Sequence, residues 1–137
     1  MEMIELASCD DALTTEIRER AKNGSACSLT KKYSVRENAT EVAYAAIDWY
    51  DLRLCSDLIL YEMFVPKKFR HSGVGSRILE KVEGLAKANG YSRVIVIARP
   101  LEDYPKEKLK AWYQQRGYEI VPHESHASED AMAKVVE

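Results

Sequence analysis

The chain has 137 residues, of which 46% are apolar, 31% are charged and three are cysteine. This length fits one domain, residues 1–137, with its own hydrophobic core, and the apolar fraction excludes an intrinsically disordered chain. No run approaches the roughly 18 apolar residues of a membrane helix, and the acidic start MEMIELASCDD is unlike a signal peptide. The odd number of cysteines at wide spacing favours neither a disulfide framework nor a metal site. We therefore expect a cytoplasmic protein without a membrane partner or a metal.

The net charge of −2 excludes a protein that coats nucleic acid through bulk charge, so no nucleic-acid partner is expected. The charge is nevertheless segregated along the chain. Residues 65–110 hold 11 Lys or Arg and 5 acidic residues, a net charge of +6. The remaining residues hold 9 Lys or Arg and 17 acidic residues, a net charge of −8. The basic span is a candidate region for an anionic ligand.

The first predicted elements are a strand over residues 2–7 and a helix after it. Asp10 or Asp11 is the expected cap of this helix, and Asn23-Gly24 is its expected end. The helical spacing places three apolar residues on one inward face: Leu13, Ile17 and Ala21. Two strands follow, over residues 32–37 and 41–50, with a turn between them.

The middle of the chain predicts a strand–helix–strand unit. Residues 58–65 are apolar on both alternating faces, which is typical of a strand that is covered on both sides. The next helix begins near Val74 and ends at Asn89-Gly90, and residues 94–98 form a second buried strand. The last helix runs from Pro105 to Gly117, before short strands over residues 118–121 and 132–136.

The turn between the strand 58–65 and its helix carries the pattern R-x-x-G-x-G at Arg70, Gly73 and Gly75. Glycines let the backbone turn tightly, and amides at a helix start attract phosphate oxygens. The turn is neither a Walker loop nor a dinucleotide fingerprint. Two alternatives stay open: the glycines serve only the bend, or the turn binds the phosphates of an unrelated nucleotide.

This segment, V-P-K-K-F-R-H-S-G-V-G-S-R-I-L, resembles the acyl-CoA signature of the GNAT superfamily, [Q/R]-x-x-G-x-[G/A]. Residues 112–118, W-Y-Q-Q-R-G-Y, resemble the superfamily's F-Y-x-x-x-G-[F/Y] segment. The resemblance implies an α/β (α+β) fold: a mixed, mostly antiparallel sheet of six or seven strands with splayed central strands, flanked by about three helices. It also implies an acetyl-CoA-dependent N-acetyltransferase, in which a primary amine of a small molecule, peptide or protein attacks directly in a ternary complex.

By the same resemblance, the backbone of Phe64 and Val65 pairs with the pantetheine arm of acetyl-CoA, and the following turn binds its pyrophosphate. Lys67 and Lys68 either steer the anionic donor or belong to a solvated loop. A monomer or a homodimer is expected. The residues expected to bind phosphate are Arg70, His71, Ser72, Gly73, Val74, Gly75 and Ser76.

Tyr113 matches the tyrosine of the second motif and is the candidate general acid for the leaving thiolate. Its alternative role is packing beside Leu109 and Trp112. Glu62 is the candidate general base, because it is the lone charge within the apolar strand 58–65 and a buried carboxylate is costly unless it is paired, protonated or used. The alternative for Glu62 is an ion pair with a neighbouring arginine, and Asp57 is the second candidate base.

Several features are left to simpler interpretations. Cys55 is not expected to act as a nucleophile, and His123 and His126 fit a solvated loop better than a metal site. Residues 24–34 and 122–130 are expected to shape the acceptor pocket. The acidic part of the chain favours a cationic acceptor. The alternative function is a non-catalytic acyl-CoA sensor.

Overall fold

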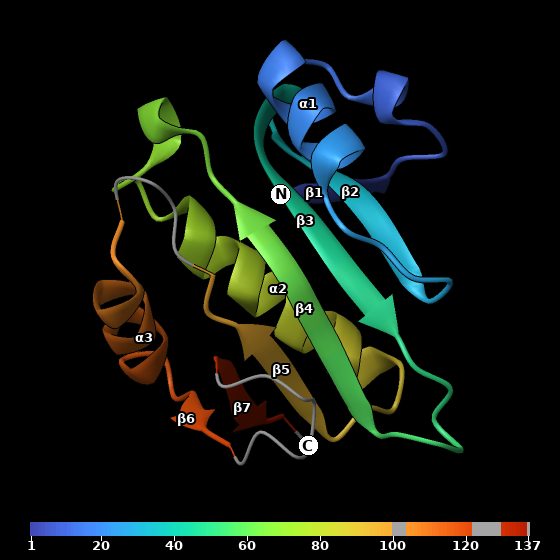
Figure 1. Cartoon of the computed structure of the whole chain (residues 1–137), viewed down its shortest axis with the longest axis vertical. Coiled ribbons are helices and arrows are strands. Elements are labelled where there is room, and N and C mark those ends of the chain that lie inside the picture. The colour runs from blue at the N-terminus through green and yellow to red at the C-terminus, as the bar shows by residue number, and fades with distance from the viewer. Residues whose placement is uncertain (100–103, 122–129, 137) are drawn as a thin grey trace.

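The computed structural model describes residues 1–99, 104–121 and 130–136. Its strands form one seven-stranded sheet in the order β1-β2-β3-β4-β5-β7-β6 (Figure 1). Every neighbouring pair is antiparallel except β4 and β5, which are parallel. The strands are β1 (Glu2–Glu5), β2 (Thr30–Glu37), β3 (Thr40–Trp49), β4 (Asp57–Phe64), β5 (Arg93–Ile97), β6 (Glu119–Ile120) and β7 (Ala131–Val135). The predicted mixed α/β fold is thus confirmed, with strand limits within two residues of those expected.

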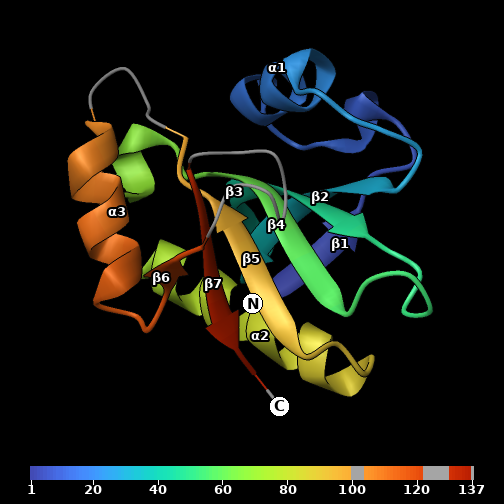
Figure 2. The ribbon, with the colours of Figure 1, turned by 60° about the horizontal axis from the view of Figure 1, so that its bottom comes forward.

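Three α-helices of the described residues cover this sheet: α1 (Thr15–Asn23), α2 (Val74–Ala88) and α3 (Lys106–Gln114). Helix α1 lies on one face, where Ile17 and Ala21 pack with Tyr44 and Ala46 of β3. Helices α2 and α3 lie on the opposite face, where Ile78 and Tyr113 join the larger core cluster (Figure 2). Buried apolar residues on both faces of β4 and β5 therefore explain why these strands are apolar throughout.

The start of α1 differs from the prediction. Asp10 and Asp11 belong to a separate 3-10 turn (Cys9–Asp11), which is capped by Ser8. Helix α1 is capped instead by Thr14, whose side chain accepts a hydrogen bond from the amide of Ile17. Because the helix begins after Leu13, that side chain leaves the predicted inward face and is 50% exposed.

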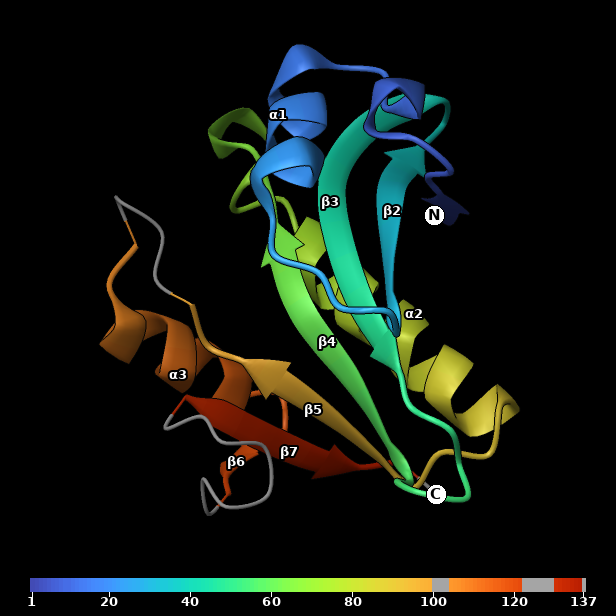
Figure 3. The same cartoon turned by 45° about the vertical axis from the view of Figure 1, so that its right-hand side comes forward.

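The two central strands separate partway along their length. The parallel ladder of β4 and β5 runs from Asp57–Arg93 to Leu60–Val96 and stops there, although β4 continues to Phe64. On its other side, β4 stays paired with β3 as far as Phe64. Figure 3 shows the two strands diverging toward the ends that follow this ladder. The splay expected from the resemblance is thus present, and it opens beside the starts of α2 and α3.

No helix within the described ranges is long and apolar enough to cross a membrane. The same residues contain no group of three or more His, Cys, Asp or Glu side chains placed to hold a metal ion.

Candidate active site

The turn that precedes α2, residues 70–76, is called the phosphate turn below. Helix α2 begins at Val74, and its first helical hydrogen bond runs from the amide of Arg77 to the carbonyl of Gly73, at 3.1 Å. The amides of residues 74–76 precede that bond and therefore have no acceptor within the helix. Together with the helix dipole, these three N–H groups form a site that suits phosphate oxygens.

The two glycines of the phosphate turn are needed for different reasons. Gly73 has a left-handed φ of 82°, which glycine adopts without strain. Gly75 has an ordinary helical position, but a Cβ there would lie 3.1 Å and 3.2 Å from two ring atoms of Trp112. The second glycine thus lets α3 approach α2 closely, a role that the motif alone does not reveal.

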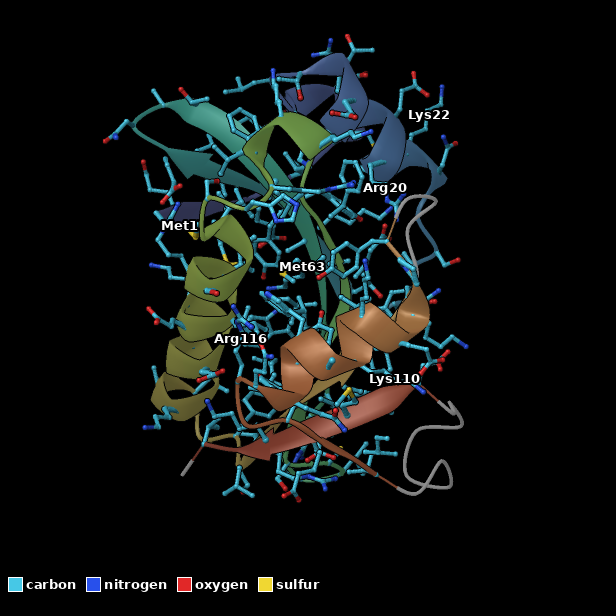
Figure 4. The ribbon with its side chains drawn as sticks, turned by 90° about the vertical axis from the view of Figure 1, so that its left-hand side faces the viewer. Met1, Arg20, Lys22, Met63, Lys110 and Arg116 are labelled. Atoms are coloured by element: carbon cyan, nitrogen blue, oxygen red, sulfur yellow. The ribbon has the colours of Figure 1, made fainter. Side chains whose placement is uncertain are left out.

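A cavity of about 420 Å³ opens where β4 and β5 separate. The phosphate turn borders it on one side and α3 on another, and Figure 4 shows Met63 between Arg20 and Arg116 when the molecule is viewed from this side. Its lining comprises Arg20, Glu62, Met63, Val65, Phe69, Arg70, His71, Gly73, Val74, Gly75, Ser76, Ile97, Arg99, Tyr104, Leu109, Trp112, Tyr113 and Arg116. Most of the residues predicted for the site are therefore brought together.

Two predicted cofactor residues lie outside this lining. The Phe64 side chain packs in the α1 cluster, so only its backbone is available for the expected pairing with pantetheine. The Ser72 hydroxyl donates a hydrogen bond to the carbonyl of Phe69. Arg70 lines the cavity and donates from Nε to the carbonyl of Val65, at 2.9 Å, which ties the phosphate turn to the end of β4.

Tyr113 lies in α3, and it combines the two roles that the sequence offered. Its ring packs edge-on against Trp112 and Tyr118, at centroid distances of 5.1 Å and 5.7 Å, and is 3% exposed. Its residue also lines the cavity. Burial raises the pKa of the Tyr113 phenol above its ordinary value, so the group is protonated at neutral pH. A protonated phenol is the form that donates a hydrogen bond or a proton.

Glu62 is placed in the cavity by an irregularity in β4. Ala46 of β3 faces Glu62, while the next residue, Ile47, faces Leu60, so Tyr61 is an extra residue opposite this pair. Residue Glu62 is 8% exposed, and its carboxylate forms an ion pair with Arg20 of α1. The structure therefore contains the arginine pairing that was one of the two alternatives for this residue.

A buried tyrosine, Tyr44, lies close to Glu62. A Cβ added to Gly24 would lie 3.2 Å from a Glu62 carboxylate oxygen and 3.3 Å from the Tyr44 hydroxyl. Burial, and then the negative charge of Glu62, raise the pKa of Tyr44 above its ordinary value. The Tyr44 hydroxyl is fully buried and has no hydrogen-bond partner among the described residues. Glu62 thus lines the cavity and also packs closely against Gly24 and Tyr44.

Asp57, the second candidate base, lies at the far end of β4. Both of its carboxylate oxygens accept hydrogen bonds from Arg93, at 2.9 Å and 3.0 Å, and it does not line the cavity. Cys55 is also outside the lining. His123 and His126, together with residues 122–129 of the predicted acceptor loop, lie outside the described residues.

Sequence reasoning did not identify three arginines that line the cavity. Arg20 comes from α1, Arg99 follows β5, and Arg116 follows α3. Arg116 was detectable in principle, because it lies four residues after Trp112 within the second motif and such residues share one helix face. Arg20 and Arg99 reach the cavity only through the tertiary fold, so no local spacing could have indicated them.

The sequence matches the family described as "Acetyltransferase (GNAT) domain" over residues 29–120, which is more than half of the chain. No curated protein matches the chain.

Solved structures show the same fold at low sequence identity. The N-acetyltransferase PaiA of Thermoplasma acidophilum, in complex with coenzyme A, has a TM-score of 0.58 at 13% identity, covering 88% of this chain and 67% of that chain. A GNAT family acetyltransferase of Elizabethkingia anophelis with acetyl-CoA bound has a TM-score of 0.59 at 14% identity, covering 90% and 83%. The KacTA–DNA complex contains a chain with a TM-score of 0.65 at 16% identity, covering 98% and 92%. With two motifs on the expected elements, a splayed sheet and a family match over most of its length, the chain belongs to the GNAT acetyltransferase family.

Proposed function

We propose that the protein transfers the acetyl group of acetyl-CoA to a primary amine by direct attack within a ternary complex. The observation that carries this proposal is the joint placement of the phosphate turn, Glu62 and Tyr113 around one cavity at the splay of β4 and β5. Acetyl-CoA is the donor typical of the family, and it supplies the thioester.

The residues at the turn end of the cavity suit the donor's phosphates. The amides of residues 74–76 provide donors, and the guanidinium groups of Arg70 and Arg116 add positive charge. The unpaired side of β4 near Phe64 and Val65 suits an extended amide-bearing chain such as pantetheine, which would add to the sheet edge.

The chemistry requires one new bond, one broken bond and two proton movements. The amine nitrogen bonds to the acetyl carbon, the carbon–sulfur bond breaks, the nitrogen loses a proton and the sulfur gains one. We assign the proton acceptor to Glu62 and the proton donor to Tyr113, whose phenol is protonated at neutral pH. A backbone amide near Val65 would stabilise the negative charge on the carbonyl oxygen.

Glu62 can act as a base only if its ion pair with Arg20 loosens when the acceptor binds. Arg20 lines the same cavity and also lies over the Phe64 ring, at 4.6 Å from the ring centroid, so it has a second partner on β4. A base must be free to contact the proton that it accepts, so the amine would have to displace Arg20 from the Glu62 carboxylate.

A thiol-release assay across amine classes tests this function, with acetyl-CoA as donor and Tyr113→Phe as the control variant. Release of CoA that depends on an amine, and that falls in the variant, supports the proposal. Tight binding of acetyl-CoA without turnover on a broad panel favours the sensor instead, and binding of ATP or NAD in place of CoA favours an unrelated nucleotide site. The lack of a nucleic-acid partner stays a prediction, since one chain of the same fold was solved in a complex with DNA.

A further inference from the structure

The part of the cavity around Glu62 is called the acceptor end below, and its charged residues are Arg20, Glu62 and Arg99. Both guanidinium groups lie over aromatic rings of β4. The Cζ atom of Arg20 is 4.6 Å from the centroid of Phe64, and that of Arg99 is 4.2 Å from the centroid of Tyr61. Cation–π contacts of this kind hold a guanidinium in place without neutralising its charge.

Among the described residues, the acceptor end has two arginines and one carboxylate, a net positive charge. Glu62 is the single acidic residue in the described lining of the cavity, and its carboxylate is already paired with Arg20. Arg99 donates from Nε to the carbonyl of Tyr61, at 3.3 Å, and has no carboxylate partner among the described residues. Within the described part of the chain, no carboxylate occupies the terminal N–H groups of Arg99, which can therefore bind an anion.

Three arginines outside the cavity differ from Arg99, because each has a carboxylate partner. Arg53 pairs with Asp51, Arg77 with Glu37 and Arg93 with Asp57, and none of these three lines the cavity. The donor's phosphates also do not account for Arg99, because their proposed site is at the start of α2, whereas Arg99 contacts Tyr61, beside Glu62.

We propose that the acceptor is a primary amine that also carries an oxyanion, a carboxylate or a phosphate, a few bonds from its nitrogen. Arg99 binds the oxyanion through its terminal N–H groups, in the forked geometry that guanidinium favours. The amine then lies beside Glu62. This inference rests on the proposed function and specifies its substrate class. It replaces the cationic acceptor that the acidic part of the chain favoured, since those acidic side chains, apart from Glu62, do not line the cavity within the described residues.

Matched amine pairs test the substrate class by thiol release. Amino acids are compared with their amides, and phosphoethanolamine with ethanolamine, while spermidine represents polycations. We expect kcat/KM to be about 10- to 100-fold higher for the member that carries the oxyanion, the range that one charge-assisted contact provides. The two pairs separate carboxylate from phosphate. Equal or higher kcat/KM for the neutral members, or for spermidine, would overturn the inference.

Variants of Arg99 test the assigned residue. In Arg99→Met the stem over Tyr61 stays apolar but the charge is lost, so KM for the anionic amine rises about 10-fold or more and the neutral amine is unaffected. Arg53→Met is the matched control, because that arginine is exposed and does not line the cavity. An unchanged preference in Arg99→Met contradicts the assignment.

Calorimetric binding of the same amines to the CoA-bound protein separates this inference from the proposed function. Arg99-dependent binding without thiol release supports the oxyanion site and argues against catalysis. Turnover of neutral amines that is indifferent to Arg99 supports catalysis and argues against the oxyanion site. No binding and no turnover contradict both.

Discussion

Arg116 donates a hydrogen bond from Nε to the hydroxyl of Ser76, at 2.9 Å, and thereby joins the end of α3 to the first turn of α2. The same guanidinium lies 3.8 Å from the centroid of the Trp112 ring and donates from Nη1 to the Trp112 carbonyl, at 2.9 Å. It has no carboxylate partner among the described residues. The Arg116 guanidinium is thus held in place next to the phosphate turn, and no carboxylate of the described residues neutralises its charge.

Replacing Arg116 by Met is therefore expected to weaken acetyl-CoA binding about 10- to 100-fold, because a charge-assisted contact to phosphate contributes roughly 1.5–3 kcal/mol. Isothermal titration with CoA and with CoA lacking its 3′-phosphate measures the effect and locates it. An equal loss for both ligands assigns Arg116 to the pyrophosphate, and a loss confined to CoA assigns it to the 3′-phosphate. Affinity equal to that of Arg53→Met would show that Arg116 has only a packing role.

Tyr113→Phe should lower kcat about 10²- to 10⁴-fold and leave the affinity for acetyl-CoA nearly unchanged, since only the proton donor is removed. The described residues offer the Tyr113 hydroxyl no hydrogen-bond partner, so the free energy of unfolding should change by less than about 0.5 kcal/mol. Steady-state kinetics and chemical denaturation measure the two effects. Full turnover in the variant would remove Tyr113 from the mechanism.

Glu62→Gln should abolish the rise of kcat/KM with pH that a general base produces. Because this change also breaks the pair with Arg20, Arg20→Gln is the informative comparison. If the pair is purely structural, both variants should lose activity to a similar extent, and the shape of the pH profile should not change. A catalytic Glu62 predicts that kcat/KM still rises with pH in Arg20→Gln, whereas this rise is lost in Glu62→Gln. Normal activity of Glu62→Gln across the pH range would refute the assignment.

Alanine at the two glycines of α2 should have opposite effects. Gly84 has nothing within 4 Å of an added Cβ, so Gly84→Ala should stabilise the protein by about 0.5–1 kcal/mol. In Gly75→Ala the added Cβ clashes with the Trp112 ring, which already contacts Arg116. This variant should destabilise the protein by about 1 kcal/mol. Thermal unfolding compares the two variants.

The Gly75 effect has its own control in Trp112→Phe. The superfamily pattern allows alanine at the position of Gly75 and commonly has phenylalanine at that of Trp112. If the indole is what excludes alanine, the double variant should be more stable than the sum of the single changes by about 1 kcal/mol. Strict additivity would mean that the ring is not the obstacle.

Glu41 links α1 to the sheet, and it should make stability depend on pH. Burial disfavours its charge, but hydrogen bonds from Ser34, Thr14 and the amide of Leu13 outweigh burial and hold the pKa of Glu41 below its ordinary value. The folded pKa is thus lower than the unfolded value of about 4.3, so the stabilisation is complete above that value and is lost as pH falls through the folded pKa.

Glu41→Gln should therefore cost roughly 2 kcal/mol or more at pH 7, and the gap to the parent protein should narrow as pH is lowered below about 4. Urea denaturation at a series of pH values measures this. Ser34→Ala removes one of the hydrogen-bond donors to Glu41, so it should lower the free energy of unfolding with the same pH dependence but by a smaller amount. A gap that is constant with pH would show that the charge of Glu41 does not matter.

The sequence predicted the strands, the position of the glycine turn before α2 and the family well, because each depends on local patterns: alternation, apolar runs and glycine spacing. The sequence misplaced the start of α1. The carboxylate of Glu41, which is distant in the sequence, accepts hydrogen bonds from the amides of Leu13 and Thr14 and so fixes where the helix begins. The sequence also could not choose between a catalytic and a paired Glu62, because the partner, Arg20, lies 42 residues away in the chain. Local patterns carry no information about such contacts.

The early end of the β4–β5 ladder has a consequence for the protein when it is empty. Residues 62–64 of β4 pair with β3 but not with β5, so this part of β4 has an unpaired strand edge inside the molecule rather than at its rim. Such an edge is a template for any extended chain, including a segment of another copy, and therefore an aggregation hazard. In the proposed function, the donor lies along that edge and binds only the folded state, so we expect solubility and thermal stability both to rise with the concentration of acyl-CoA. In the proposed function, the gap between β4 and β5 thus also makes the lifetime of the folded protein depend on the concentration of acyl-CoA.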